Sequence, residues 1–75
     1  MDIQDFIKNL ANQFDDPDSI IITPSTEFKK LDEWNSLAAL SVICMIDEEY
    51  GIAINGESIR NANTVQDLFD IISKS

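Results

Sequence analysis

The stretch that decides the fold is residues 32–51, DEWNSLAALSVICMIDEEYG. Nine of the ten residues in 37–46 are apolar, and acidic residues flank this run on both sides. Asparagine is a favoured N-cap residue, and glycine is the usual residue where a helix closes in a left-handed turn. Asn35 and Gly51 occupy these two places, so the sequence predicts a helix over residues 36–50.

This predicted helix is apolar nearly all round, and such a helix needs burial on more than one side. We expect its larger apolar residues to face the core: Leu37, Leu40, Ile43, Ile46 and, at the end, Tyr50. The smaller or more flexible ones would then lie nearer the surface as a contact patch for partner proteins: Ala38, Val42 and Met45. The alternative is that these three residues pack under the long first loop. Cys44 is expected to be an inert core thiol.

Three further helical segments are predicted, one before this helix and two after it. Apolar residues at helical spacing predict a first helix that begins after Asp2 and ends at the DDPD run of residues 15–18. A short helical turn is expected within residues 57–61. Thr64, with Asp67 three residues further on, resembles a capping box and predicts the start of the last helix.

Residues 15–35 form a long first loop between the first two helices. A loop of this length is uncommon in a compact domain, so we expect its apolar residues to pin it to the helices: Ile20, Ile21, Ile22, Phe28, Leu31 and Trp34. No convincing second strand exists to pair with the isoleucine run. The sequence therefore predicts an all-α fold, a small four-helix bundle of three main helices plus one short helix, as a single domain over residues 1–75.

Composition limits the partners and the location. The 75 residues include 14 acidic and 5 basic ones, giving a net charge of −9. Nucleic acid and anionic membrane surfaces would be repelled, so a basic protein surface is the expected complement. No apolar run reaches the about 20 residues that cross a bilayer, and the N-terminal residues do not resemble a signal peptide. One cysteine fits a reducing compartment, so we expect a cytoplasmic protein.

The sequence offers little for catalysis or metal binding. It contains no histidine, which is the commonest general base and metal ligand. The acidic run of residues 15–18 lacks the glycine and the final acid that a calcium loop needs. No combination of acid, base and nucleophile is evident, so we expect neither an enzyme nor a metal site.

Ser36 stands at the predicted start of the central helix. Serine often occupies helix starts for structural reasons alone. A phosphate ester on this hydroxyl would lie beside free backbone N–H groups and the positive end of the helix dipole, an effect of about 0.3–1 kcal/mol. Ser36 is therefore a candidate for covalent modification.

Several motifs together resemble the acyl carrier protein family. They are Asn35-Ser36-Leu37, the run DEEYGI at 47–52 and the run TVQDL at 64–68. The resemblance covers the whole chain, including its length, acidity, helix order and long first loop. It implies a four-helix fold and a 4′-phosphopantetheine group, derived from coenzyme A, on Ser36, with Asn35 and Leu37 as its motif neighbours. Acyl groups would be carried as thioesters on that arm.

The resemblance also implies partners. These are a phosphopantetheinyl transferase and acyl-transfer or condensing enzymes with basic docking patches, visited by a monomeric carrier. The candidate docking residues are Trp34, Ala38, Ser41, Val42, Met45, Asp47 and Glu48. Asn35 stands where the family usually has aspartate, and Ala38 and Ser41 stand at positions that are usually acidic. These departures predict a less charged docking face. The expected pathway is fatty-acid-like or specialised (polyketide or lipid) biosynthesis, and the departures make the specialised one more plausible.

Two alternatives stay open. An aminoacyl or peptidyl carrier would have the same fold and the same modified serine but a different cargo. A helical interaction module would leave Ser36 unmodified and bind a basic partner through its acidic surface. Trp34 has two interpretations as well, because it can hold the loop against the central helix or act as an exposed docking anchor.

Overall fold

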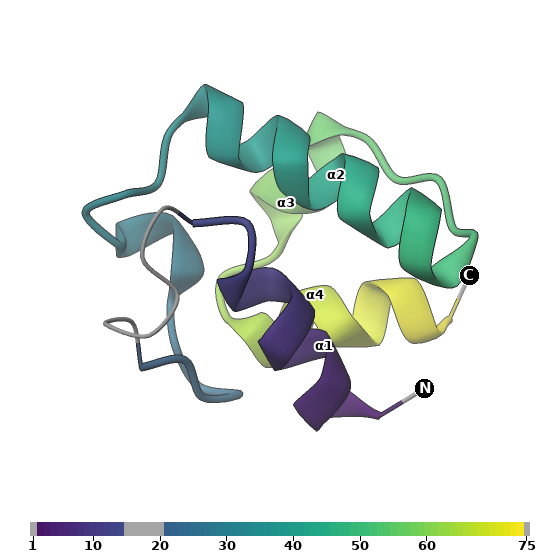
Figure 1. Cartoon of the computed structure of the whole chain (residues 1–75), viewed down its shortest axis with the longest axis horizontal. Helices are drawn as coiled ribbons and strands as arrows, with labels where there is room; N and C mark the ends of the chain where they lie inside the picture. The colour runs from purple at the N-terminus through teal and green to yellow at the C-terminus, as the bar shows by residue number, and fades with distance from the viewer. Residues whose placement is uncertain (1, 15–20, 75) are drawn as a thin grey trace.

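The computed structural model describes residues 2–14 and 21–74. It contains α1 (Ile3–Ala11), the 3₁₀ helix η2 (Phe28–Lys30), α2 (Ser36–Tyr50), α3 (Gly56–Asn61) and α4 (Val65–Ser73). In Figure 1, α2 runs across the top of the view, α3 lies behind it, and α1 and α4 lie below. The all-α prediction of three main helices and one short helix is confirmed, and the described residues contain no β-strand.

Local capping signals set the helix boundaries. Oδ1 of Asp2 accepts a hydrogen bond from the backbone N–H of Gln4 at 3.1 Å, which caps α1. At the start of α4, Thr64 and Asp67 form the predicted capping box, with both reciprocal bonds at 3.1 Å. Gly51 ends α2 with a φ of 67°, a left-handed conformation that glycine adopts readily.

The first helix is shorter than predicted, because residues 12–14 leave the α-helix. The N–H of Gln13 donates to the carbonyl of Leu10, and the N–H of Phe14 donates to the carbonyl of Ala11, each at 3.1 Å. These bonds span three residues instead of four, so the chain tightens at the helix end. Phe14 is still buried, which explains why its spacing resembled that of a helical core residue.

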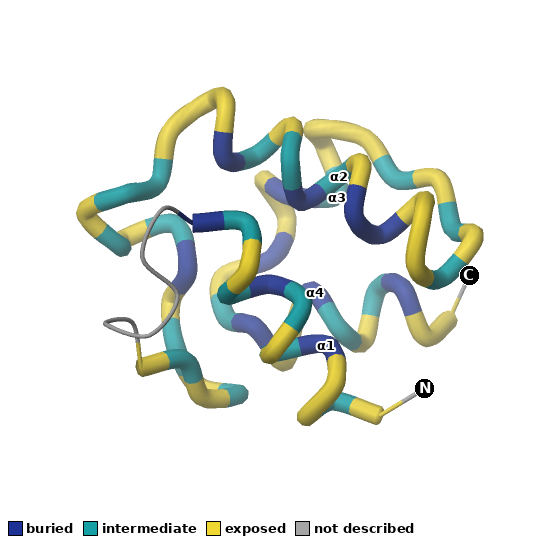
Figure 2. The backbone as a smooth tube through the Cα atoms, in the orientation of Figure 1, coloured by how far each residue is buried: buried dark blue, intermediate teal, exposed yellow. Residues whose placement is uncertain are grey.

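One hydrophobic core joins the helices. α1 packs against α2 and α4, and α3 also packs against both of these helices. Figure 2 shows buried residues in each of the four α-helices. The core consists of Phe6, Leu10, Phe28, Val42, Met45, Ile46, Ile59, Ala62, Val65, Leu68 and Ile72. Full burial of a large apolar side chain stabilises a fold by about 1.5–3 kcal/mol, so these residues hold the helices together.

The described part of the first loop is pinned to the helices. Phe28, in η2, is completely buried, and its ring meets that of Trp34 edge-on at a centroid distance of 5.1 Å. The carbonyl groups of Pro24 and Thr26 accept hydrogen bonds from first-turn N–H groups of α4, at 2.8 and 3.0 Å. The loop thereby satisfies donors that a helix start leaves free.

The predicted pins of this loop are confirmed only in part. Ile22, Leu31 and Trp34 pack against the core, but Ile21 is 85% exposed, so its prediction as a pin is wrong. Ile20 and the DDPD run at 15–18 lie outside the described residues. Within the described ranges, no helix has the length and apolar character needed to cross a membrane.

Candidate functional site

Ser36 is the first residue of α2, and it is exposed. The preceding residue, Asn35, has an extended backbone, and its Oδ1 accepts a hydrogen bond from the N–H of Ala38 at 2.8 Å. The cap fixes the direction in which α2 begins, so Ser36 is presented at the surface on a rigid element. Because the chain contains no histidine, this hydroxyl has no imidazole base to activate it. The arrangement suits a serine that is modified by another protein.

A surface groove of about 450 Å³ lies beside Ser36, between the start of α2 and α3. Its lining residues come from η2, the segment before α2, α2 and α3, and they are Lys29, Trp34, Asn35, Ser36, Ala39, Gly56, Ile59 and Arg60. Trp34 and Ile59 supply apolar walls, and Lys29 and Arg60 supply positive charge. The groove therefore combines an accessible hydroxyl, apolar surface and two cations.

Trp34 is half-buried and is held from two sides. Its ring lies 5.1 Å from that of Phe28 and 6.5 Å from that of Phe14, measured between ring centroids. It also lines the groove beside Ser36. Trp34 therefore joins η2 to the segment that follows α1, and its exposed part belongs to the groove wall.

The predicted orientation of α2 is confirmed only in part. Ile46 is buried in the core, and Ile43 and Tyr50 pack against it, but the prediction is wrong for Leu37 and Leu40. Ala38, Val42 and Met45 are buried, with exposed fractions of 8%, 0% and 4%, whereas Leu37 and Leu40 are 72% and 60% exposed. Apolar residues surround this helix, so the pattern alone indicates no single inward face. Packing against α1 and α3 instead selects the face of Ala38, Val42, Met45 and Ile46.

Two consequences follow for the predicted docking residues. Ala38, Val42 and Met45 are buried, so the prediction that they form an exposed contact patch is wrong. Asp47 and Glu48 are exposed, and Ser41 is half-buried. Leu37 and Leu40, which the sequence pattern assigned to the core, supply the exposed apolar surface of α2 instead.

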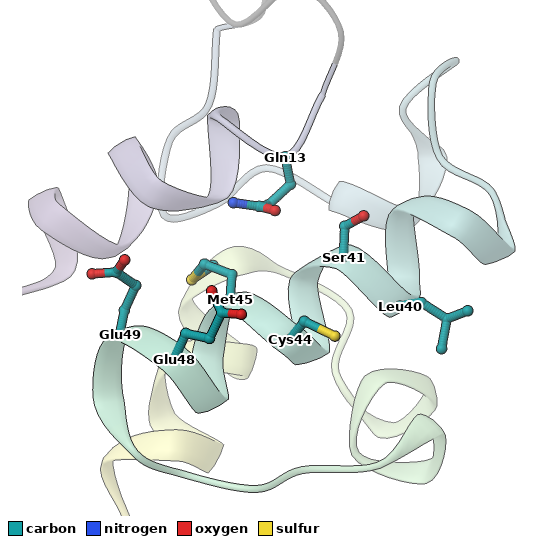
Figure 3. A pocket seen from close by; sticks show the side chains of 7 residues that line it. All are labelled: Gln13, Leu40, Ser41, Cys44, Met45, Glu48 and Glu49. Carbon is teal, nitrogen blue, oxygen red and sulfur yellow. The ribbon is translucent and has the colours of Figure 1, made fainter.

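A second hollow, of about 300 Å³, lies between α2 and the segment that follows α1. Figure 3 shows Gln13 facing α2 across this hollow, with Leu40 and Cys44 further along the outer side of the helix. Glu48 and Glu49 give one end of it negative charge. Cys44 is exposed, so the prediction of a core thiol is wrong, for the same reason that Leu40 was misplaced.

Two site residues were missed in the sequence, namely Lys29 and Arg60. They are 31 positions apart, and Nζ of Lys29 donates a hydrogen bond to the backbone carbonyl of Arg60 at 2.9 Å. No short motif links them, so no sequence signal could have paired them. In the part of the chain that the structure describes, no cluster of three or more His, Cys, Asp or Glu side chains could hold a metal ion.

No protein-family model matches this chain, and no significant match was found among curated proteins or among solved structures.

Proposed function

We propose that this protein is an acyl carrier, with a 4′-phosphopantetheine arm on Ser36 that holds acyl groups as thioesters. The observation that carries the proposal is the exposure of Ser36 at the capped start of α2, beside a groove of about 450 Å³. A transferase can reach a hydroxyl in this position. The choice of 4′-phosphopantetheine as the attached group rests on the resemblance of the motifs around Ser36 to those of acyl carrier proteins.

The chemistry of loading fits the residues present. The Ser36 hydroxyl oxygen would form a P–O bond to the phosphorus of coenzyme A that bears the pantetheine. The bond from that phosphorus to the adenosine bisphosphate half breaks, and the hydroxyl proton is released to the transferase or to solvent. Since this chain has no histidine to take that proton, the base belongs to the transferase. The arm supplies a thiol at its tip for thioester formation.

The role of this chain's own residues is presentation. Asn35 caps α2 and keeps Ser36 at the surface. A flexible arm on this rigid position raises the effective concentration of the cargo at each partner's active site. The carrier itself needs no acid, base or nucleophile for this task, and we therefore propose no catalytic activity of its own.

The exposed face of α2 is the proposed docking surface for a transferase and for acyl-transfer or condensing enzymes. Leu37 and Leu40 provide apolar contacts, and Asp47 and Glu48 provide exposed carboxylates near the other end of the helix. An apolar stripe next to acidic residues fits a partner with an apolar contact inside a basic rim. This surface replaces the patch of Ala38, Val42 and Met45.

The proposed setting is a specialised lipid or polyketide pathway in the cytoplasm. The exposed α2 stripe is more apolar than charged over residues 37–44, which favours a dedicated set of partners. The single exposed thiol, Cys44, suits a reducing compartment.

The experiment that tests the carrier function is in vitro loading. The purified chain is incubated with coenzyme A, magnesium and a broad-specificity phosphopantetheinyl transferase, and its intact mass is measured. We expect the mass to rise by one phosphopantetheine. Ser36→Ala should show no increase in mass. The control Ser58→Ala, which changes another serine near a helix start, should be loaded to the same extent as the original sequence.

A mass that never changes, or a Ser36→Ala variant that loads normally, would refute the proposal. In the first case the protein is better explained as an interaction module with an unmodified serine. In the second case, peptide mapping of the loaded sample identifies the residue that is modified in place of Ser36.

A further inference from the structure

The groove beside Ser36 is a positively charged place on a strongly acidic protein. The chain carries 14 acidic and 5 basic residues, yet two of the basic ones, Lys29 and Arg60, line this groove, and none of its eight lining residues is acidic. By contrast, the hollow on the other side of α2 includes Glu48 and Glu49. This distribution of charge favours the binding of an anion beside Ser36 and disfavours it beside Glu48 and Glu49.

Both cations are available to an anion in the groove. The hydrogen bond from Nζ of Lys29 to the carbonyl of Arg60, at 2.9 Å, uses one of the three N–H donors of the ammonium group and leaves two. The neighbouring Lys30 differs, because it pairs with Glu27 at 3.2 Å. Among the described residues, neither Lys29 nor Arg60 forms such an ion pair.

The hydrogen bond also fixes the position of the two charges. Lys29 lies in η2 and is half-buried, whereas Arg60 lies in α3 and is exposed. Holding the lysine against the backbone of α3 reduces the freedom that a surface lysine normally has, so less entropy is lost when it binds an anion. The guanidinium of Arg60 adds donors whose planar arrangement matches two oxygens of a phosphate group.

We infer that Lys29 and Arg60 bind the phosphodiester of the arm on Ser36, so that the arm begins in the groove between α2 and α3. This inference rests on the proposed function and adds the residues that anchor the arm's charged end. Trp34 and Ile59, the apolar walls of the same groove, flank the path that the arm would follow.

This placement separates the arm from the docking surface. Ala39 lines the groove, whereas Leu40, one residue further on, lines the hollow on the other side of α2. An arm anchored by Lys29 and Arg60 leaves Leu37 and Leu40 free to contact a partner. The anchor is electrostatic and surface-exposed, so salt should weaken it.

The test compares loaded proteins that differ only in these charges. The variants are Arg60→Gln, the double variant Lys29→Gln/Arg60→Gln and, as a control with the same change in net charge, Lys8→Gln/Lys74→Gln. Intact mass first establishes that each protein carries the arm. Phosphorus NMR then measures the chemical shift of the phosphodiester, with the same loaded protein unfolded in urea as the reference.

We expect the original sequence and the control to share a shift that is displaced from the unfolded reference. Arg60→Gln should lose part of this displacement, and the double variant should lose most of it. Raising salt from about 0.1 to 1 M, which shortens the screening length from about 10 to 3 Å, should reduce the displacement in the original sequence and change the double variant little.

An identical shift in the folded and unfolded original protein, or in all folded variants, would overturn the inference while leaving the carrier function intact. A chain that never gains the mass of the arm would instead overturn the proposed function. Because Lys29 also contacts the backbone of α3, the exposed Arg60 is the deciding single substitution if the double variant does not fold.

Discussion

The side-chain amide of Asn9 donates a hydrogen bond to the hydroxyl of Tyr50 at 3.0 Å, which joins α1 to the last residue of α2 across 41 positions of sequence. The ring of Tyr50 also lies near that of Phe6, at a centroid distance of 6.1 Å. Tyr50→Phe should keep the ring contact and lose the hydrogen bond, lowering the free energy of unfolding by about 0.5–1.5 kcal/mol.

Urea denaturation of Tyr50→Phe, Asn9→Ala and the double variant measures this bond. If the two residues act together, the double variant should be less destabilised than the sum of the single ones, because the bond is already lost in each. Strictly additive effects would show that the contact contributes nothing to stability.

The orientation of α2 predicts a large effect for one of its apolar residues and a small effect for another. Met45→Ala should lower the free energy of unfolding by about 2–5 kcal/mol, because this side chain is almost fully buried. Leu40→Ala should change it by about 0.5 kcal/mol or less, because Leu40 is 60% exposed. Thermal and urea denaturation of both variants provide the comparison. A larger loss of free energy of unfolding for Leu40→Ala than for Met45→Ala would contradict this orientation and support the one that the sequence pattern predicted.

The cap of α2 makes a prediction about Asn35. Asn35→Ala removes the bond from Oδ1 to the N–H of Ala38 and should lower the free energy of unfolding by about 1 kcal/mol. Asn35→Asp keeps the bond and adds a negative charge at the helix start, so it should instead raise that free energy by about 0.3–1 kcal/mol. Urea midpoints at low salt distinguish the two. Equal stability of all three sequences would mean that this cap does not stabilise α2.

Asp67 predicts a specific dependence of stability on pH. Hydrogen bonds from the backbone N–H groups of Thr64 and Asn63, each at 3.1 Å, hold the pKa of this carboxyl below its ordinary value. The folded state therefore favours the ionised form. This contribution to stability is complete above the unfolded pKa, about 3.9, and is lost as pH falls through the lower folded pKa.

The variant Asp67→Asn tests this dependence, because its side chain does not ionise. We expect it to be less stable than the original sequence near neutral pH, and we expect the difference to shrink below about pH 4. Urea midpoints measured in parallel for both proteins between neutral and acid pH give the result. A difference that stays constant across this range would contradict the assignment.

Much of the fold was readable from local patterns. Asn35, Gly51 and Thr64 marked three helix boundaries correctly, because caps satisfy backbone groups through neighbours only a few residues away. The end of α1 was less predictable. There Phe14 stays buried although the helix has already ended at Ala11, so burial at helical spacing was mistaken for helix.

The candidate site likewise combines a feature that the sequence predicted with one that it could not predict. The sequence indicated Ser36 as the residue at a helix start, and the fold presents it at the surface. The sequence could not show that Lys29 and Arg60 would meet beside it, since they come from η2 and α3. Charges that are distant along the chain become neighbours only when the loop and the helices pack.

The sequence by itself determined that the chain is helical, where its main helices begin and which serine heads the central one, because short-range capping and turn chemistry decide those features. Only the tertiary structure decided which side of α2 faces inward. Apolar residues surround that helix, so its own pattern favours no single direction, and the surfaces offered by α1 and α3 select Val42 and Met45 for burial and leave Leu37 and Leu40 outside.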